Sequence, residues 1–549
     1  MEALYHRFSR AEFDENGQIT KFELDYPENF NFGYDVVDAI AAQEPEKRAV
    51  VWCDDEGNKR ILSFGEISRL SSQTANFLIR QGIRRGDRVM LMLKRRYEYW
   101  YVITALHKIG AVAIPASHML TTGDIVYRAN VADIRTIVCA DDEALCNKVL
   151  DASKQVPCLD NLFTVRKDHG GFRRLDKLIK QESTELTRVQ TRVGDSLLLY
   201  FTSGTTGYPK AVIHNHAYPL AHIVTGVYWH CVQNDGLHLT VADTGWAKSS
   251  WGKIYGQWLG GSAVMAYDYD RFDAAKMMDV LEKYKVTTFC APPTLYRLMA
   301  KSGIRPEAFA SIKHVATAGE ALQEEIIRLF HEKTGLEIME GFGQSETTLI
   351  IGNFAGGKPK RGSMGKPSPL YRVRLVDADG NDVPVGETGE IVIDARERVP
   401  EGLCLGYENN DDANARCWKD GIFHTGDTAY ADEDGYYYYV SRLDDVIKSS
   451  GYRIGPFEVE STLIQHPAVV ECAVTGVPDA ERGNLIKATV VLQAGVEPSD
   501  ALKTELQEFV KERTAPYKRP RIIEFVDELP KTISGKIRYN VIRQKDAKQ

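Results

Sequence analysis

Short apolar runs and amphipathic segments alternate along most of the chain. The runs at 49–53, 88–93 and 111–115 are typical of buried strands, and apolar residues at helical spacing predict helices at 64–81 and 98–109 between them. The same order returns farther along, with helices predicted at 274–284 and 323–333 and strands at 287–291 and 337–339. This alternation predicts an α/β fold with layered, largely parallel sheets, whose ligand sites lie at the carboxyl ends of the strands.

Beyond residue 365 the pattern becomes richer in strands. Segments at 373–376, 390–393 and 436–440 are separated by turn signals, which predicts a β-rich subdomain. After residues 441–445 a further stretch has the length of an independent domain. Its predicted elements are helices at 459–464 and 502–513 and strands at 469–474 and 487–492. We therefore expect a large amino-terminal domain at 1–441 and a small, mobile α+β domain at 442–549.

Composition and charge narrow the class of protein. With 549 residues, 43% of them hydrophobic and 26% charged, the chain is typical of a multidomain globular protein, and its net charge of −8 argues against broad nucleic-acid binding. The nine cysteines include no Cys-x-x-Cys pair, which favours reduced thiols in a cytoplasmic protein. The amino terminus has no apolar run typical of a secretion signal, and the apolar segment at 101–115 is shorter than the roughly 20 residues that span a bilayer.

A glycine-rich loop is the strongest single chemical signal. The apolar run at 197–201 predicts a buried strand, and it ends in small hydroxyl residues, two glycines and a lysine. Glycines let backbone N–H groups face a phosphate, hydroxyls donate further hydrogen bonds, and lysine adds a positive charge. The spacing differs from that of P-loop NTPases. The candidate phosphate-binding residues are Thr202, Ser203, Gly204, Thr205, Thr206, Gly207 and Lys210.

Two later segments follow predicted strands and can face a nucleotide. In 341–347, the glycine-flanked Phe342 can stack on a base and Glu346 can hold Mg²⁺ beside phosphates; the alternative is a turn with a solvated glutamate. The turn at 318–321 can close over a nucleotide, or it is an ordinary loop before a helix.

Three further segments lie in the last quarter of the chain. Asp427, in His424-Thr425-Gly426-Asp427, can accept hydrogen bonds from ribose hydroxyls. Arg442 can bind phosphate in the charged segment 442–453, unless that segment is only a solvated linker. Lys536, beside Gly535 near the carboxyl terminus, can reach a reacting phosphate or carboxylate, although an exposed lysine is usually only solvated.

The glycine-rich loop and the segments 341–347, 424–427, 442–453 and 530–536 are five ordered segments that together resemble the adenylate-forming (ANL) superfamily, and the resemblance covers nearly the whole chain. The segment Ala242-Asp243-Thr244-Gly245-Trp246 is similar to the branch of acetyl-CoA and medium-chain acyl-CoA synthetases. The resemblance implies that a carboxylic acid reacts with Mg-ATP to give acyl-AMP and pyrophosphate. The carboxy-terminal domain then rotates, and the thiol of CoA displaces AMP. The implied cofactors and substrates are ATP, Mg²⁺, CoA and a short- to medium-chain acid, branched and aromatic acids included.

The resemblance also assigns roles to residues. The loop from Thr202 to Lys210 is expected to hold the β- and γ-phosphates, Glu346 to bind Mg²⁺, Asp427 to bind the ribose, and Arg442 to lie by ribose and phosphate. Lys536 is expected to bridge carboxylate and phosphate, where a fixed cation offsets developing charge. The catalytic residues are thus Lys536, Glu346 and Arg442. The remaining nucleotide-binding residues are Gly319, Glu320, Ala321, Glu340, Gly341, Phe342, Gly343, Gln344 and Ser345.

Further roles concern the second step and the acyl group. Asp444 is the expected hinge. The expected CoA-binding residues are Ser450, Gly451, Tyr452, Arg453 and Arg482. The expected acyl pocket comprises Trp229, Trp246, Lys248, Trp251, Cys290 and Gly343. Acetyl-specific relatives carry tryptophan at the position of Gly343, so glycine permits a longer or branched acyl group.

Several points stay open at this stage. Lys248 is unusual in an apolar pocket: it pairs with an acidic neighbour, faces solvent or binds the substrate. Ser345 and Ser441 replace a threonine and a glycine that are usual in the family, and the second replacement leaves the hinge geometry open. A homodimer is also open. The alternative functions are an adenylation enzyme that loads a carrier protein and a non-catalytic carboxylate or nucleotide sensor, although retention of both Lys210 and Lys536 counts against the sensor.

Overall fold

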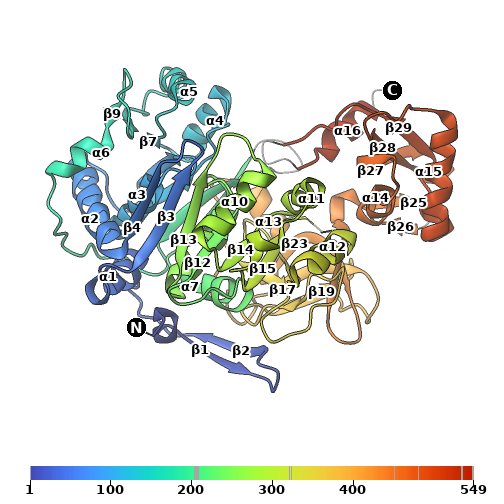
Figure 1. The fold of residues 1–549 in the computed structure, drawn as a ribbon, viewed down its shortest axis with the longest axis horizontal. Coiled ribbons are helices and arrows are strands. Elements are labelled where there is room, and N and C mark those ends of the chain that lie inside the picture. Colours follow the sequence, from blue (N-terminus) through green and yellow to red (C-terminus); the bar gives the residue numbers. More distant parts are fainter. Residues whose placement is uncertain are drawn as a thin grey trace. The chain divides into compact units, whose positions relative to one another are not determined.

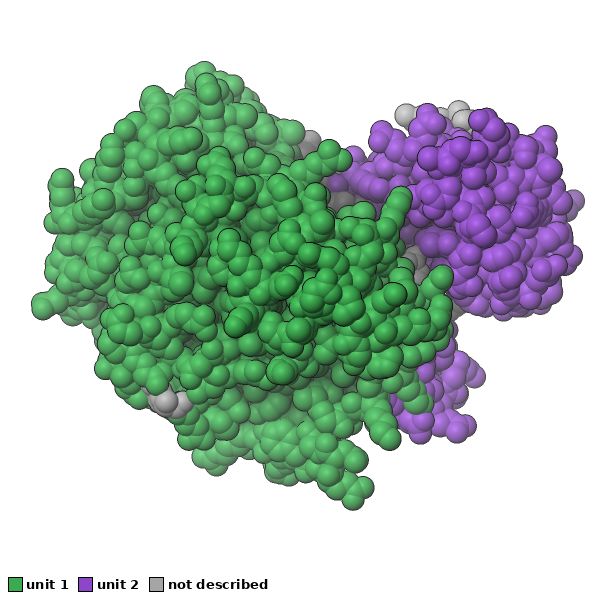
Figure 2. All heavy atoms as spheres, viewed as in Figure 1, with its two compact units in different colours: residues 1–204, 208–372, 395–416 green, residues 205–207, 373–394, 417–549 purple. Residues whose placement is uncertain are grey.

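A computed structural model describes residues 2–202, 209–320, 322, 324–450, 452–479, 481–532 and 536–546, apart from the side chain of residue 453. The chain forms two compact units (Figure 2). The first contains residues 1–204, 208–372 and 395–416, and the second contains residues 205–207, 373–394 and 417–549. No helix in the described ranges is both long and apolar enough to cross a bilayer.

The first unit is built on two large sheets. The nine-stranded sheet has a parallel centre with antiparallel strands at its ends. Its strands, in spatial order, are β18 (Lys366–Pro367), β17 (Leu349–Gly352), β16 (Ile338–Gly343), β15 (His314–Ala318), β14 (Thr288–Cys290), β12 (Leu237–Thr240), β13 (Ala263–Asp268), β3 (Arg48–Asp54) and β4 (Lys59–Ser63).

The eight-stranded sheet is parallel except at one end. Its strands, in spatial order, are β21 (Gly406–Tyr407), β11 (Lys210–Asn215), β10 (Ser196–Thr202), β6 (Val112–Pro115), β5 (Arg88–Met92), β7 (Thr136–Cys139), β8 (Asn161–Thr164) and β9 (Arg173–Arg174). β11 is antiparallel to both of its neighbours, β10 and β21. The predicted α/β architecture with largely parallel sheets is therefore confirmed.

The central strands bury both faces, which explains why they are continuous apolar runs in the sequence. In β3, Val50 and Trp52 belong to one core cluster, whereas Val51 and Cys53 belong to another. Helix α3 (Glu98–Ile109) joins the first of these clusters and is buried along its whole length. It packs beside α2 (Phe64–Arg80), which begins with a Ser63–Glu66 capping box. The second cluster lies under α10 (Ala274–Tyr284), seen against the nine-stranded sheet in Figure 1.

The second unit begins with an antiparallel sheet. It comprises β19 (Val373–Val376), β20 (Gly389–Asp394), β22 (Trp418–Lys419), β23 (Ile422–Ala431) and β24 (Tyr437–Arg442), which confirms the expected β-rich segment. After η6 (Leu443–Asp445) come β25 (Ile447–Ser449), β26 (Tyr452–Ile454), α14 (Pro456–Ile464), β27 (Val469–Asp479), β28 (Gly483–Leu492), α15 (Asp500–Arg513), η7 (Pro516–Lys518), β29 (Ile522–Phe525) and α16 (Tyr539–Asp546). The domain division between residues 441 and 442 stays a prediction.

Two glycines permit a close backbone crossing inside the first unit. A Cβ at Gly226 would lie 2.4 Å from the carbonyl carbon of Gly256, and a Cβ at Gly256 would lie 2.1 Å from the carbonyl oxygen of His222. Backbone atoms cannot move aside as a flexible side chain does. The packing of η4 (Val224–Trp229) on α9 (Tyr255–Leu259) therefore requires both glycines.

We expect Gly226→Ala to lower the free energy of unfolding by about 2 kcal/mol or more, because the added methyl group overpacks this crossing. Urea unfolding followed by tryptophan fluorescence measures the change. Gly123→Ala is the matched control: Gly123 lies in α4 (Thr122–Val131), and the nearest atom to an added Cβ is 4.0 Å away. This control should be neutral or slightly stabilising. Equal stability of the two variants would contradict the packing argument.

Candidate active site

The two described ends of the glycine-rich loop lie on paired antiparallel strands. β10 ends at Thr202, β11 begins at Lys210, and these two residues are directly opposite each other. Tyr127 of α4 donates from Oη to the carbonyl oxygen of Pro209 at 3.0 Å. The candidates Ser203, Gly204, Thr205, Thr206 and Gly207 lie outside the described residues. Unlike a P-loop, this loop is followed by an antiparallel strand and not by a helix.

A tyrosine connects the lysine of this hairpin to the candidate magnesium ligand. The Nζ atom of Lys210 lies 5.1 Å from the centroid of the Tyr407 ring, within the range of a cation–π contact. Tyr407 in turn donates from Oη to Oε1 of Glu346 at 2.8 Å. Tyr407 lies on β21, next to β11 in the sheet. The sequence analysis missed this residue, because a glycine–tyrosine pair in a turn-rich stretch carries no separate signal.

The backbone around Glu346 is held from two sides. Nε2 of His214, on β11, lies 2.7 Å from the carbonyl oxygen of Ser345, and the backbone N–H of Cys404 donates to the carbonyl of Glu346 at 2.8 Å. Burial lowers the pKa of His214 to about 4, so the ring is neutral and its hydrogen bond to a carbonyl places the proton on Nε2. His214 is a second residue that the sequence analysis missed.

The two candidate nucleotide segments meet at the carboxyl edge of the nine-stranded sheet. β15 and β16 are adjacent and parallel, with Ala318 opposite Gly341. Gly319 follows β15 with a φ of +106°, a conformation that favours glycine. The neighbouring Glu320 accepts hydrogen bonds from Thr294 at 3.3 Å and Arg297 at 3.4 Å. The sheet therefore brings the two segments together, while Ala321 lies outside the described residues.

Glu340 differs from the other carboxylates at this edge because it is buried. Its side chain accepts a hydrogen bond from the backbone N–H of Leu322 at 3.2 Å. Burial raises the pKa of Glu340 to about 7. A carboxyl group with this pKa changes its protonation near neutral pH. Its neighbour Phe342 is half-buried in β16.

Two tryptophans occupy the space beside two glycines of β16. A Cβ at Gly341 would lie 2.8 Å from the Trp229 ring, and a Cβ at Gly343 would lie 2.4 Å from the Trp251 ring. The two rings pack edge to face, with centroids 6.2 Å apart. Because Gly343 has no side chain, the Trp251 ring can pack directly against its backbone. Cys290, at the end of β14, is also buried, and burial raises its pKa.

Lys248 links the tryptophan segment to the nucleotide segment. It is the first residue of α8 (Lys248–Gly252), and its Nζ donates to the carbonyl oxygen of Ala318 at 2.7 Å. That carbonyl precedes Gly319, so the ammonium group lies at the carboxyl end of β15. Trp246, two residues before Lys248, is half-buried. The expected acyl-side and nucleotide-side residues of the first unit therefore share one edge of the sheet.

In the second unit, a hydrogen-bonded pair joins two candidates. Asp427 of β23 and Arg442 of β24 are directly opposite each other, and Nη1 of Arg442 lies 3.3 Å from Oδ2 of Asp427. Tyr439, which the sequence analysis missed, donates to Oδ1 of Asp427 at 3.2 Å. Ser441 fits the strand pairing, since its carbonyl accepts the Thr428 hydroxyl at 3.0 Å.

The expected hinge lies in η6, where Asp444 is exposed. The next residue, Asp445, forms an ion pair with Arg543 of α16 at 2.6 Å. This contact ties the residue after the expected hinge to the helix that follows Lys536.

Two of the expected CoA residues, Ser450 and Arg482, contact each other beside the hairpin of β25 and β26. Ser450 has a φ of +50° and exchanges two hydrogen bonds with Arg482: its backbone N–H donates to the Arg482 carbonyl at 2.8 Å, and Nη1 of Arg482 donates to its hydroxyl at 3.1 Å. Gly451 and the side chain of Arg453 lie outside the described residues. Lys536 is exposed, and the backbone N–H of Thr532 donates to its carbonyl oxygen at 2.7 Å.

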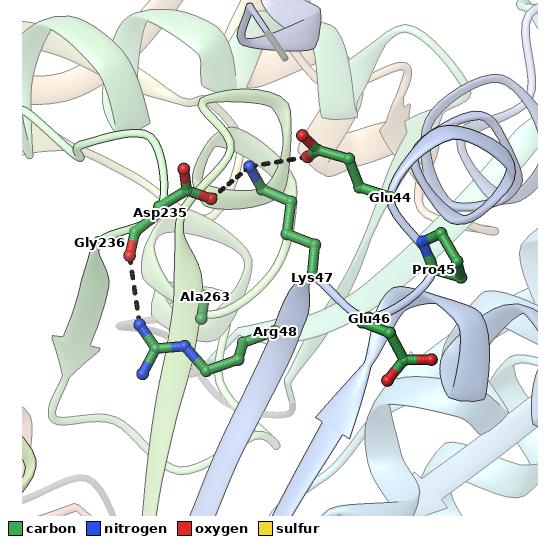
Figure 3. Close-up of a pocket in the computed structure, with 8 residues that line it drawn as sticks. All are labelled: Glu44, Pro45, Glu46, Lys47, Arg48, Asp235, Gly236 and Ala263. Atoms are coloured by element: carbon green, nitrogen blue, oxygen red, sulfur yellow. Dashed lines mark hydrogen bonds and ion pairs between the residues drawn. The ribbon is translucent and has the colours of Figure 1, made fainter.

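A hollow of about 420 Å³ lies away from all these residues of the first unit (Figure 3). It opens at the amino ends of β3 and β13, which begin at Arg48 and Ala263. Lys47 crosses it, with Nζ 2.7 Å from Asp235 and 3.2 Å from Glu44. Because Gly319 and Phe342 lie at the carboxyl ends of parallel strands in the same sheet, this hollow is at the opposite edge.

The chain is similar to known proteins along nearly its whole length. Residues 37–407 match the AMP-binding enzyme family, and residues 458–536 match the AMP-binding enzyme C-terminal domain. The chain is 41% identical over 536 residues to the acyl-coenzyme A synthetase ACSM3, mitochondrial, of Homo sapiens, and the match covers 96% of this chain and 91% of that protein.

Two solved structures extend the comparison. The anthranilate CoA ligase AuaEII in complex with anthranoyl-AMP has a TM-score of 0.86 and 29% identity, covering 95% of this chain and 98% of that one. A benzoate CoA ligase from Burkholderia xenovorans LB400 has a TM-score of 0.82 and 28% identity, covering 94% of this chain and 100% of that one.

The comparisons correct one expectation. The human relative is a mitochondrial protein, as are the similar proteins of rat and mouse. The cytoplasmic location expected from the scattered cysteines is therefore wrong. Reduced thiols indicate a reducing environment, but they do not identify the compartment.

We expect Glu340→Gln to remove a pH dependence of stability. Folding raises the pKa of Glu340 from 4.5 to about 7, so the folded state retains a proton that the unfolded state loses in this window. The contribution of Glu340 to stability therefore falls as pH rises through the window. The variant should match the wild type at about pH 4 and exceed it by up to about 3 kcal/mol at about pH 8.

Urea unfolding at several pH values measures this difference. Glutamine still offers an acceptor to the N–H of Leu322, so the comparison isolates the charge. The control is Glu320→Gln, which changes an exposed carboxylate near the same edge of the sheet and should retain the wild-type pH slope. A wild-type slope in Glu340→Gln would show that Glu340 has an ordinary pKa.

Proposed function

The chain belongs to the AMP-binding enzyme family, and we propose that it acts as an AMP-forming acyl-CoA synthetase. It uses ATP to join a short- to medium-chain carboxylic acid, branched and aromatic acids included, to CoA. The geometric observation that carries the proposal is the contact series from Lys210 through Tyr407 to Glu346. A cation, Lys210, and a carboxylate, Glu346, therefore lie close together beside the described ends of the glycine-rich loop. The cation suits a polyphosphate, and the carboxylate suits the metal ion that accompanies it.

The residues at this position fit a magnesium ion. Mg²⁺ in nucleotide sites is typically held by one or two carboxylates together with substrate phosphates and water. Glu346 supplies one such carboxylate, and the described parts of the chain contain no cluster of three or more metal-ligating side chains that would form an all-protein cage. When bound, the ion neutralises part of the phosphate charge. Glu346 would hold the ion, and Tyr407 orients the Glu346 carboxylate.

In the first reaction, a carboxylate oxygen of the acid forms a bond to the α-phosphorus of ATP, and the bond between that phosphorus and the bridging oxygen to the β-phosphate breaks. The glycine-rich loop and Lys210 bind the departing pyrophosphate. Lys536 offsets the negative charge shared by the carboxylate and the α-phosphate. Residues Gly319–Ala321 and Gly341–Phe342 enclose the adenine, and Asp427 accepts hydrogen bonds from the ribose hydroxyls. Arg442 keeps Asp427 in place and lies by the ribose and phosphate.

In the second reaction, the CoA thiol loses its proton to solvent, its sulfur forms a bond to the acyl carbon, and AMP leaves with the electrons of the acyl–oxygen bond. A rotation near Asp444 switches the enzyme from the first reaction to the second. It removes Lys536 from the acyl-AMP and brings the segment 450–453 to the same place. Ser450, Gly451, Tyr452 and Arg453 then line the path of CoA, with Arg482 beside Ser450.

The acyl group lies against the tryptophans. Trp229, Trp246, Trp251 and Cys290 provide an apolar surface, and Gly343 leaves room for Trp251. Such a surface suits aliphatic and aromatic acids better than charged ones. The relatives whose names refer to anthranilate and benzoate use aromatic acids. Lys248, held at the Ala318 carbonyl, lies where the acyl and nucleotide sides meet.

Separate assays of the two reactions test the proposal. Pyrophosphate release from ATP should require a carboxylic acid from a panel of short, medium, branched and aromatic acids, and AMP release should then require free CoA. Lys536→Ala should slow pyrophosphate release about 100-fold or more, as the loss of a transition-state charge partner does. It should leave thioester formation from supplied acyl-AMP close to the wild-type rate.

Lys531→Ala is the matched control. Lys531 is exposed, lies five residues before Lys536 and pairs with Glu471, so its loss should change neither reaction. Absence of pyrophosphate release with every acid would overturn the enzymatic proposal. AMP release with a carrier protein but not with CoA would identify a carrier-loading enzyme. Equal loss of both reactions in Lys536→Ala would contradict the role given to Lys536.

We also expect Tyr407→Phe to weaken ATP binding. The change removes the hydroxyl that orients Glu346 and keeps the ring beneath Lys210, and a hydrogen bond to a charged group is worth enough to raise the KM for Mg-ATP about tenfold. Tyr407→Leu, which also removes the ring, should raise this KM further. Initial rates of pyrophosphate release at varied Mg-ATP measure both effects. A wild-type KM in both variants would show that Tyr407 has no part in ATP binding.

A further inference from the structure

A buried contact between a carboxyl group and a phenol lies in the second unit and involves none of the residues assigned so far. Oη of Tyr539 is 3.0 Å from Oε1 and 3.1 Å from Oε2 of Glu460. The backbone N–H of Val474 also donates to Oε1, at 2.7 Å. Glu460 is only 7% exposed. A buried carboxyl group that loses such a partner has little water to replace it, so the contact holds its elements together.

This contact is where the segment that carries Lys536 joins the rest of the second unit. Tyr539 begins α16, three residues after Lys536, and Glu460 lies in the middle of α14. The Tyr539 side chain also packs against a small core of Ala473, Leu529 and Ile542. Apolar packing is non-directional, so the hydrogen bonds to Glu460 fix the orientation of this end of the segment.

The described residues of the segment are hydrogen-bonded to one another. Lys531 and Ile537 form an antiparallel bridge. The backbone N–H of Lys536 donates to Oγ1 of Thr532 at 3.1 Å. The backbone of Lys536 is therefore tied to its neighbours on both sides of residues 533–535, and a shift of the anchor at Tyr539 also displaces Lys536.

Another polar contact of the same segment is much weaker. Nζ of Lys531 lies 2.8 Å from Oε2 of Glu471, but the two side chains are 42% and 28% exposed. Ion pairs on a protein surface contribute little, because water competes for both charges and screens them. The buried contact of Tyr539 with Glu460 is therefore the stronger anchor.

We propose that Tyr539 and Glu460 are positioning residues for the first reaction: their buried contact fixes the segment from which Lys536 reaches the carboxylate and the α-phosphate. This inference rests on the proposed function, and in particular on the role given there to Lys536. Tyr539 and Glu460 act through Lys536 and not on the substrates themselves. The effect is large enough to measure, because a displacement of about 1 Å in a catalytic group can slow a reaction about 100-fold.

The contact does not depend on one protonation state of Glu460. Burial raises the pKa of this carboxyl group to about 7, although the hydrogen bonds from Val474 and Tyr539 favour the charged form. A charged carboxylate accepts the phenol hydrogen, and a protonated carboxyl group still offers its carbonyl oxygen. A neutral amide can therefore take the place of this carboxyl group.

Tyr539→Phe tests the inference by removing only the hydroxyl. It should lower kcat for acid-dependent pyrophosphate release about tenfold and leave the KM for Mg-ATP within about twofold of the wild type, because Lys536 acts on developing charge. Thioester formation from supplied acyl-AMP, which does not use Lys536, should keep the wild-type rate and shows that the variant is folded. In the Lys536→Ala background, Tyr539→Phe should cause no further slowing.

Two further variants separate this contact from general damage. Glu460→Gln keeps an acceptor for the N–H of Val474 and a polar partner for Tyr539, so it should retain pyrophosphate release within about twofold of the wild type. Tyr438→Phe is the matched control. It removes another tyrosine hydroxyl of the second unit, one that donates to Asp432 at 3.1 Å, and should change neither reaction.

The outcomes distinguish this inference from the proposed function. Unchanged pyrophosphate release in Tyr539→Phe, equal loss of both reactions in that variant, or a further loss in the Lys536→Ala background would overturn the positioning role while leaving the synthetase proposal intact. Wild-type pyrophosphate release in Lys536→Ala would overturn the role of Lys536 and the inference with it. Absence of pyrophosphate release in the wild type would overturn the synthetase proposal itself.

Discussion

Burial of both faces of the central strands decides where chemistry can occur in the first unit. Side chains of β3 enter two separate cores, Val50 and Trp52 on one side and Val51 and Cys53 on the other. A strand buried in this way has no place for solvated polar groups along its length. The candidate residues therefore lie where strands end, at Thr202, Gly319 and Gly343. The described ends of the glycine-rich loop and the two nucleotide segments lie at such positions because the same constraint applies to each of their strands.

Polar side chains at these strand ends are held by contacts between distant parts of the sequence. Tyr407 connects Lys210 to Glu346, His214 holds the backbone next to Glu346, and Lys248 binds the end of β15. Each contact positions a charged or hydrogen-bonding group before substrate binds, which lowers the cost of reorganisation during the reaction. In the second unit, Asp427 is held in a similar way by Arg442 and Tyr439.

Some parts of the structure could be predicted because their signals are local. The helix at 98–109 has the predicted bounds, since its apolar residues cover the whole surface of a buried helix and Gly110 ends it in the left-handed conformation. The residues Tyr407, His214 and Tyr439 could not be found this way. A single tyrosine or histidine is common in core and surface alike, and only its partner, 12 to 131 residues away, reveals what it does. Lys248 was left open for the same reason.

The sequence by itself determined the α/β architecture, the order of the five chemical segments and the family to which the chain belongs. The architecture follows from periodicity, and the family follows from the resemblance of the ordered motifs; both are properties of the sequence alone. Only the tertiary structure decided that Gly343 makes room for Trp251, that Lys248 joins the end of β15, and that Tyr539 contacts the buried Glu460. These three facts depend on strand order and on packing between distant segments, and no local pattern records which segments the fold places side by side.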